Sequence, residues 1–165
     1  DSVLLATGSS RTTPRIPGIR ELEGHGVSYC AVCDAFFYRG KSVAVLGNSD
    51  YALHEALELL PVAGSVTLLT DGLPLSVEVP EQIQTDLRKI AAIRGTEQVE
   101  AVEFSEGDPL PADGIFVAYG VAGSSDLAKK IGAVTDGNGL LQISKAVYEG
   151  AKAGTEMIQY IRKLK

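Results

Sequence analysis

Residues 42–70 read SVAVLGNSDYALHEALELLPVAGSVTLLT, and this stretch decides the fold. Residues 42–46 and 65–70 are short apolar runs rich in Val and Leu, which is typical of buried strands. Between them the three- and four-residue spacing of a helix holds at Ala52, Leu53, Ala56, Leu57 and Leu60. Pro61 and Gly64 end this helix. A strand, a helix and a strand within roughly 30 residues form a βαβ unit, so the two strands are parallel and joined by a right-handed crossover.

The segments on either side continue the mixture of strands and helices. Apolar or alternating runs predict strands at residues 3–6, 26–29, 99–104 and 114–120. Helical patterns predict helices at residues 31–37, 80–92, 126–131, 140–153 and 156–164, the last two separated by Gly154. The polar stretch 9–18, with two prolines, is a linker or a domain crossing. The sequence therefore predicts an α/β fold with a parallel sheet.

Composition narrows the function. The chain has 165 residues, a net charge of −6 and 45% hydrophobic residues, so a packed core is expected. An acidic chain argues against nucleic-acid binding, which needs a basic face. No apolar run approaches the roughly 20 residues of a spanning helix, so we expect no membrane insertion. No signal peptide is visible, and a first residue other than Met indicates an excised piece. We expect a cytoplasmic protein.

The two cysteines form one motif, Cys30-Ala31-Val32-Cys33, at the start of a predicted helix. Two intervening residues let the sulfur atoms meet, and a helix N-terminus lowers the pKa of a thiol. Asp34 follows directly and can carry the proton that dithiol exchange releases and consumes. Two other interpretations stay open: half of a zinc site, with His25 or His54, and ordinary buried cysteines. The aromatic residues 36–38 are expected in the core.

Four stretches together resemble low-molecular-weight thioredoxin reductases. They are CAVCDAFFYRGK at 30–41, ATGS at 6–9 with IPG at 16–18, DGIFVAYG at 113–120, and LLQI at 140–143. The resemblance implies a flavoprotein with two dinucleotide-binding domains, in which this chain carries the Rossmann-like central, NADPH-type domain and remnants of the FAD domain at both ends. It implies a domain arrangement of 1–18 (FAD-domain remnant and crossing linker), 19–122 (central dithiol-bearing domain) and 123–165 (FAD-domain remnant helices).

The resemblance also assigns roles. Cys30 and Cys33 would form the disulfide that takes electrons from FAD and passes them to thioredoxin, with Cys33 facing the flavin and Cys30 meeting the partner. Asp34 would be the acid and base. The predicted FAD contacts are Ala6, Thr7, Gly8, Gln142 and Ile143. The family is homodimeric.

The nicotinamide site departs from the family pattern. The family's Gly-x-Gly-x-x-Ala appears here as Gly47-Asn48-Ser49-Asp50-Tyr51-Ala52, so Gly47 begins a degenerate nucleotide turn. Ser49 replaces the glycine that lets a pyrophosphate approach the backbone, and Asp71 would repel the 2′-phosphate of NADPH. Asp71 could instead accept a ribose diol, as in NADH binding, or be an ordinary turn residue. Residues 47–60 and 114–126 resemble ferredoxin-dependent flavin thioredoxin reductases, which implies ferredoxin as donor and makes NADPH unexpected.

A second departure concerns FAD. The family begins with a Gly-x-Gly-x-x-Gly segment and has a Gly-Asp motif before its last helix, whereas here residues 136–139 run directly into Leu140. We therefore expect a chain truncated in its FAD domain, whose central part folds at about residues 19–122, and which binds FAD poorly and is inactive alone. Two other function classes compete with the reductase: a nucleotide-binding module without a redox role, and a degenerate interaction domain.

Overall fold

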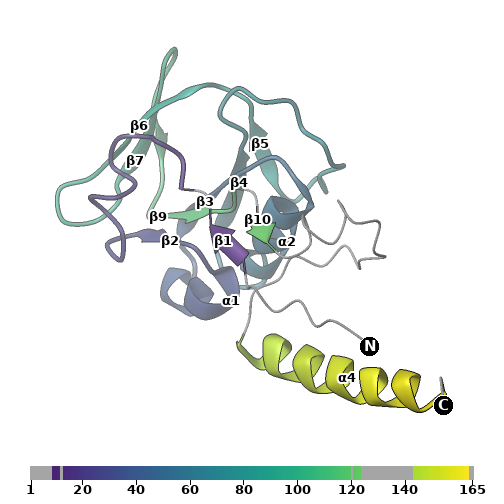
Figure 1. Cartoon of the computed structure of the whole chain (residues 1–165). Helices are drawn as coiled ribbons and strands as arrows, with labels where there is room; N and C mark the ends of the chain where they lie inside the picture. The colour runs from purple at the N-terminus through teal and green to yellow at the C-terminus, as the bar shows by residue number, and fades with distance from the viewer. Residues whose placement is uncertain (1–8, 12, 120, 124–142, 164–165) are drawn as a thin grey trace. The chain divides into compact units, whose positions relative to one another are not determined.

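The computed structural model of the chain describes residues 9–11, 13–119, 121–123 and 143–163. The chain, whose helices and strands are labelled in Figure 1, divides into two compact units. One unit contains residues 12–120, and the other combines residues 1–11 with residues 121–165. The unit of residues 12–120 carries both cysteines and the βαβ segment, so it holds the motifs that the sequence singles out.

A five-stranded sheet organises this unit, in the strand order β2-β9-β3-β4-β5. Its strands are β2 (Val27–Ser28), β3 (Ser42–Leu46), β4 (Ser65–Leu69), β5 (Gln84–Asp86) and β9 (Gly114–Val117). All four neighbouring pairs are parallel. Helix α2 (Asp50–Leu59) connects β3 to β4. The predicted α/β fold, with its parallel sheet and βαβ unit, is confirmed.

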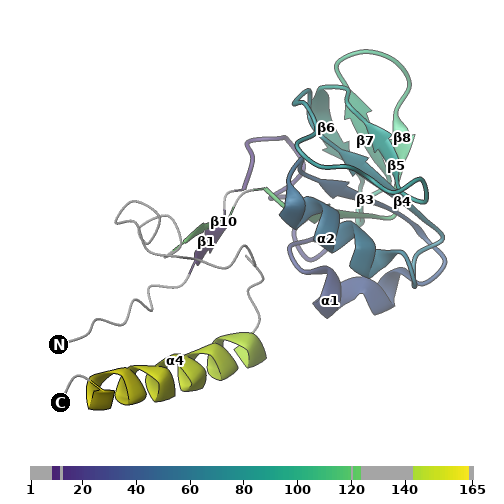
Figure 2. The same ribbon diagram turned by 90° about the vertical axis from the view of Figure 1, so that its right-hand side faces the viewer.

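The sheet is covered on both faces (Figure 2). One face carries α2 together with α1 (Ala31–Asp34) and the 3₁₀ turn η1 (Ala35–Tyr38). The other face carries a three-stranded antiparallel sheet of β6 (Ile90–Arg94), β7 (Ala101–Phe104) and β8 (Leu110–Pro111). Alternate residues of a strand point to opposite faces, so β3 supplies both cores. Val43 and Val45 pack in the helix-side cluster, and Ala44 and Leu46 pack in the other.

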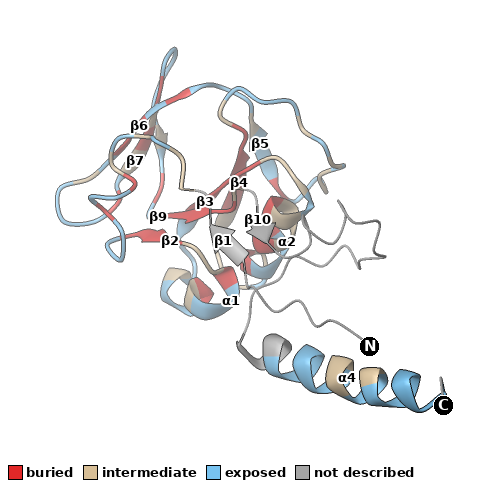
Figure 3. Cartoon of the chain, viewed as in Figure 1, coloured by how far each residue is buried: buried red, intermediate tan, exposed pale blue. Residues whose placement is uncertain are grey.

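The buried residues are concentrated in the central strands of the sheet (Figure 3). All four residues of β9 are buried, as are four of the five in β3 and in β4. Strands that are covered on both faces read as nearly continuous apolar runs, which is the pattern of residues 42–46 and 114–117. Phe116 is fully buried, and its ring meets Tyr38 edge to face at 5.1 Å between centroids. The central strands are thus the rigid platform of the unit.

The helix predicted for residues 80–92 is wrong. This segment forms β5 and the beginning of β6, joined by a turn in which Arg88 bonds to Asp86. Its apolar residues fit a helical spacing, but Leu87, which such a helix would use on its apolar face, is 54% exposed. Pairing with β4 and packing of Ile90 and Ile93 in the core outweigh the local helical preference.

In the second unit, β1 (Ser9–Arg11) pairs with β10 (Val121–Gly123) as antiparallel strands. Helix α4 runs from Ile143 to Lys163 without a break. The predicted separation at Gly154 is therefore wrong, since one glycine costs a helix only about 1 kcal/mol relative to alanine and keeps its backbone donor. No helix in the described part of the chain is long and apolar enough to cross a membrane. The strand predicted at 3–6 and the helix at 126–131 lie outside the described residues.

Candidate functional site

The two cysteines lie in the segment 28–38, which we call the dithiol turn and which connects β2 to β3. Cys30 and Cys33 are joined in a disulfide, with their Cα atoms 5.3 Å apart. Cys33 is exposed to solvent, whereas Cys30 is partly buried. A disulfide that closes so small a ring at the surface is open to attack by a thiolate from another molecule.

Hydrogen bonds hold the dithiol turn in shape. Cys30 is the N-cap of α1, with extended backbone, and its Sγ accepts the N–H of Cys33 at 3.2 Å. The Oγ of buried Ser28 accepts the N–H of Cys30 at 3.2 Å and donates to Oδ2 of Asp34 at 2.5 Å. One serine therefore ties the first cysteine to the carboxylate. The structure brings Cys30, Cys33 and Asp34 together in a single turn of chain.

The helix after Cys30 is shorter than predicted. The expected helix over residues 31–37 is one α-helical turn followed by the 3₁₀ turn η1. A single turn aligns too few peptide groups for a strong dipole, so the predicted lowering of the thiol pKa by a helix N-terminus loses most of its basis. The first amide of α1 is also already used: the N–H of Ala31 donates to Oε2 of Glu55 at 2.6 Å.

Sequence reasoning missed both Ser28 and Glu55. Glu55 is only 3% exposed and lies on the buried side of α2 with Ala52, Ala56 and Leu59. A signal for it exists in the sequence, because a glutamate three residues after Ala52 and four before Leu59 stands on the apolar stripe of its helix. A carboxylate at such a position needs a buried donor.

An apolar surface surrounds the disulfide. Val32, Phe36 and Phe37 are 48%, 72% and 68% exposed. The guanidinium of Arg39 lies 5.7 Å from the ring centroid of Phe36. The prediction that residues 36–38 belong to the core is wrong for the two phenylalanines, and only Tyr38 packs inward. Exposed neighbouring apolar residues beside a reactive group are typical of a surface that meets another protein.

Tyr38 forms the inner wall of the dithiol turn. Burial raises the pKa of its phenol, and the nearby carboxylates of Asp34 and Asp113 raise this pKa further. Tyr38 therefore stays neutral at physiological pH and acts as packing between η1 and Phe116.

The second candidate site is the nucleotide turn, residues 47–52, between β3 and α2. A Cβ atom on Gly47 would lie 2.6 Å from the carbonyl oxygen of Ala118 and 2.7 Å from Cβ of Ala52. This glycine is therefore required for the packing of β3, α2 and the end of β9. Ser49 is the N-cap of α2, and Asp50 is in its first turn, where a carboxylate is favourable. The glycine alone is no evidence for a bound nucleotide.

Residues 74–76 lie across the nucleotide turn. The backbone N–H and the Oγ of Ser76 both donate to the carbonyl oxygen of Asn48, at 3.1 and 2.7 Å. The side-chain amide of Asn48 donates in return to the carbonyl oxygen of Pro74 at 2.9 Å. The carbonyl oxygen and the side-chain N–H of Asn48 are thus bonded to the protein's own chain.

Asp71, which follows β4, is similarly engaged. It adopts the left-handed backbone conformation, with φ of 54°, that fits a turn residue. Its carboxylate accepts from Nζ of Lys89 at 2.8 Å and from the N–H of Ile90 at 2.9 Å. The hydroxyl of Tyr119 also donates to it, and burial together with this carboxylate raises the pKa of Tyr119. Three donors within the protein therefore already bond to the carboxylate that would accept the hydroxyl groups of a ribose.

The other predicted sites are only partly described. Ile143 begins α4. The remaining predicted FAD contacts, Ala6, Thr7, Gly8 and Gln142, lie outside the described residues. Within the described ranges no three His, Cys, Asp or Glu side chains gather as a metal site would require.

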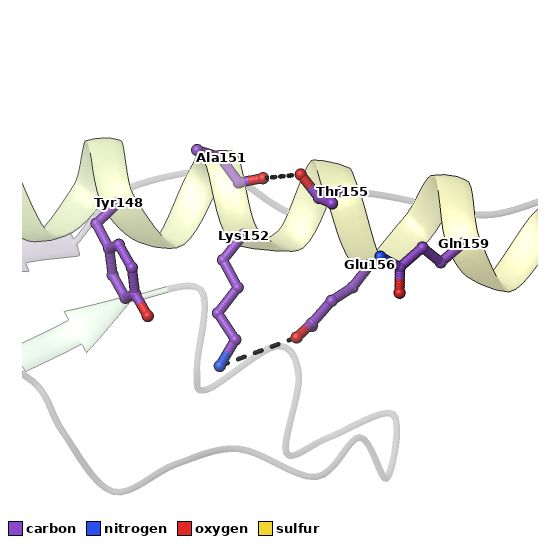
Figure 4. A pocket seen from close by; sticks show the side chains of 6 residues that line it. All are labelled: Tyr148, Ala151, Lys152, Thr155, Glu156 and Gln159. Carbon is purple, nitrogen blue, oxygen red and sulfur yellow. Dashed lines mark hydrogen bonds and ion pairs between the residues drawn. The ribbon is translucent and has the colours of Figure 1, made fainter.

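A hollow lies along α4 (Figure 4). It is lined by Tyr148, Ala151, Lys152, Thr155, Glu156 and Gln159. All six come from one helix, and the contacts among them, such as Lys152 with Glu156 at 3.9 Å, are ordinary pairs four residues apart. The hollow brings together no side chains from different described elements, so we assign it no role.

A Cys-x-x-Cys disulfide and a dinucleotide-type turn on one parallel sheet are the features of flavoprotein disulfide oxidoreductases as a class. Residues 1–147 match the family described as pyridine nucleotide-disulphide oxidoreductase. The chain belongs to this family, whose members depend on flavin.

Within the family, the chain is similar to thioredoxin reductases. The thioredoxin reductase of Coxiella burnetii is 30% identical over 94% of this chain and 52% of that protein. The atypical thioredoxin reductase TRi of Desulfovibrio vulgaris Hildenborough has a solved structure that matches with a TM-score of 0.64 at 37% identity, over 94% of this chain and 63% of that one. The ferredoxin-flavin thioredoxin reductase of Clostridium acetobutylicum matches with a TM-score of 0.59 at 30% identity, over 67% of this chain and 38% of that one.

The chain spans about half the length of the curated relatives it matches. The similarity to thioredoxin reductases predicted from the sequence is confirmed.

Proposed function

We propose that this chain is the dithiol-carrying part of a flavin-dependent thioredoxin reductase, and that Cys30 and Cys33 pass electrons to the disulfide of thioredoxin. The observation that carries this proposal is the Cys30–Cys33 disulfide in a turn with Asp34 and an exposed apolar surface. The relatives named thioredoxin reductase support the choice of substrate. The compartment that suits a thioredoxin reductase is the reducing cytoplasm.

The proposed exchange takes two steps. In the reduced protein the Cys30 thiolate attacks one sulfur of the partner's disulfide, the S–S bond of the partner breaks, and the released thiolate takes up a proton. Cys33, as thiolate, then attacks Sγ of Cys30, and the mixed disulfide breaks to free the second thiol of the partner. The partner gains two electrons and two protons, and Cys30–Cys33 is again a disulfide. When bound, FAD would supply the two electrons that reopen this disulfide.

Asp34 serves these proton transfers. Its carboxylate is partly buried and held by the hydroxyl of Ser28, in the same turn as both sulfur atoms. A carboxylate so placed accepts the proton of a thiol that is about to attack and returns it to the thiolate that leaves. Cys30 is proposed as the attacking thiol because its Sγ already accepts an N–H, which stabilises a thiolate.

For the electron donor we propose ferredoxin rather than NADPH. The nucleotide turn is bonded to residues 74–76, and the carboxylate of Asp71 is bonded to Lys89, Ile90 and Tyr119. A nicotinamide nucleotide would have to compete with these internal bonds at Asn48 and Asp71, which also weakens the alternatives of NADH use and of a nucleotide-binding module. One similar solved structure is itself named a ferredoxin-flavin thioredoxin reductase.

Trapping the mixed disulfide tests the thiol assignment. Cys33→Ser leaves Cys30 free to attack, so it is expected to form a stable mixed disulfide with a thioredoxin that lacks its own second cysteine. The matched variant Cys30→Ser is expected to trap little or none. The reverse pattern would assign attack to Cys33, and no trapping by either variant would refute the thioredoxin proposal.

A spectroscopic titration tests the cofactor and donor. The purified chain is mixed with FAD and passed over gel filtration, which also reports the oligomeric state. Co-elution of a flavin band allows turnover assays with reduced ferredoxin, NADPH and NADH, in which only ferredoxin is expected to support thioredoxin reduction. Activity with NADPH would refute the donor proposal. We also propose that the chain is inactive alone, which predicts no co-eluting flavin but two thiols released by a dithiol reductant.

A further inference from the structure

Glu55 is a buried carboxylate that the proposed exchange does not use. It is 3% exposed, although glutamate is rarely buried without a specific partner. Its neighbours on the same face of α2, Ala52, Ala56 and Leu59, are fully buried apolar residues. One of its partners is the N–H of Ala31, at 2.6 Å, across 24 residues of sequence. A contact so short and so shielded from water is strong.

The bonded amide is the peptide group that joins Cys30 to Ala31. Oε2 of Glu55 therefore lies one peptide unit away from Cys30, inside the protein, where charges are poorly screened. Three other ionisable side chains lie near Cys30 and Glu55: Asp34 in the dithiol turn, Tyr29 just before Cys30, and Tyr51 on α2. The hydroxyl of Tyr51 donates to the carbonyl oxygen of Tyr29 at 3.5 Å. Glu55 is more deeply buried than Asp34, the other carboxylate near Cys30.

We propose that Glu55 is a positioning residue for the dithiol, which fixes the Cys30–Ala31 peptide and makes the reduced pair a stronger reductant. A negative charge near Cys30 opposes a thiolate there. It therefore makes the reduced pair less stable relative to the disulfide, and this lowers the reduction potential. A lower potential favours the transfer of electrons onward to a partner disulfide. The inference rests on the proposed function, since it requires a redox-active pair.

The experiment compares two substitutions on one helix. Glu55→Gln keeps the size of the side chain and an acceptor oxygen for Ala31 but removes the charge. Glu58→Gln removes the same charge from an exposed position one turn away, where Glu58 lies 3.9 Å from His54. The full chain with each change is equilibrated with buffers of reduced and oxidised dithiothreitol, and free thiols are counted. The reduced proteins are also alkylated with iodoacetamide at neutral pH.

We expect Glu55→Gln to move the dithiol–disulfide equilibrium about tenfold toward the dithiol, which is roughly 30 mV for this two-electron couple. Alkylation is expected to accelerate by a similar factor, because a larger fraction of the thiol is ionised. Glu58→Gln is expected to match the wild type. A purely structural Glu55 would lower thermal stability and leave the equilibrium unchanged, and that result would overturn the inference.

A second measurement covers the case in which Glu55→Gln does not fold. In wild-type protein labelled with ¹³C-glutamate, the carboxyl resonance of Glu55 is followed through reduction of the disulfide. Coupling is reciprocal, so this resonance should shift on reduction and that of Glu58 should not. An unchanged Glu55 resonance overturns the inference. A wild-type pair that no dithiol reductant opens would refute the proposed function itself, which is a distinct result.

Discussion

The dithiol turn and the nucleotide turn follow two strands of one sheet, β2 and β3, which β9 separates, but they differ in what they expose to solvent. The dithiol turn exposes Cys33 and the phenylalanines to solvent. In the nucleotide turn, the carbonyl oxygen and side-chain N–H of Asn48 bond to residues 74–76, and Asp71 is bonded to three internal donors. In this fold, packing alone already requires the glycine of the nucleotide turn, and the dithiol turn holds the two cysteines in one turn of chain.

The largest expected effect separates packing from ligand binding at Gly47. We expect Gly47→Ala to lower the free energy of unfolding by about 2 to 3 kcal/mol, because the new Cβ overlaps the backbone of Ala118. Gly40→Ala, two residues after the dithiol turn, places its Cβ where no atom lies within 4 Å, and the φ of 71° should cost only about 1 kcal/mol. Urea denaturation measures both. Equal losses of unfolding free energy in the two variants would show that packing does not require a glycine at position 47.

A smaller effect is expected at the exposed aromatics. Replacing Phe36 and Phe37 together by Ala should slow disulfide exchange with thioredoxin about tenfold, since aromatic side chains dominate protein interfaces. Stability should change by less than about 0.5 kcal/mol, because both rings are in solvent. Leu73→Ala, an exposed apolar residue near the nucleotide turn, is the matched control and should leave exchange unchanged. Equal exchange rates for the wild type, the Phe36 and Phe37 double variant and Leu73→Ala would show that the dithiol turn is not the surface that meets thioredoxin.

The smallest effect compares two tyrosines, one behind each turn. Burial raises the pKa of Tyr38 and of Tyr119 above the ordinary value, so both stay protonated in the folded protein when the unfolded chain ionises near pH 10. The contribution of these tyrosines to the free energy of unfolding is therefore fully present below about pH 10. It is lost as the pH rises toward the pKa values of the folded state. Tyr119→Phe should flatten this fall more than Tyr38→Phe, because Tyr119 also bonds to Asp71. Thermal unfolding between pH 9 and pH 11 measures the difference, and identical slopes would contradict it.

Local pattern was sufficient where an element is decided by its own residues. The apolar runs at 42–46 and 65–69, with the helix between them, are strands β3 and β4 and helix α2. The Cys-x-x-Cys spacing was likewise enough to place both sulfur atoms in one turn. In each case the deciding contacts lie within a few residues of each other or within the βαβ unit.

Pattern failed where distant contacts decide. Residues 84–86 form a strand because β4 offers them an open edge, which no local spacing records. The role of Asp71 depends on Lys89 and Tyr119, which lie far along the chain. The sequence predicted no role for Glu55, whose buried carboxylate bonds to the N–H of Ala31, 24 residues away in sequence. The missing information in all three cases is which segments become neighbours in space.

The strand order has a consequence for how the chain folds as it is made. β2 pairs with β9, so Val27 has no strand partner until Ile115 has been synthesised. Contacts so distant in sequence form slowly, because the entropy cost of closing a long loop comes before the contacts can stabilise the chain. During synthesis from the N-terminus, the cysteines at 30 and 33 therefore emerge well before the sheet that holds them. The two cysteines are close enough in sequence to pair at any stage, but the sheet that holds the dithiol turn is completed only by a strand encoded more than 80 residues downstream.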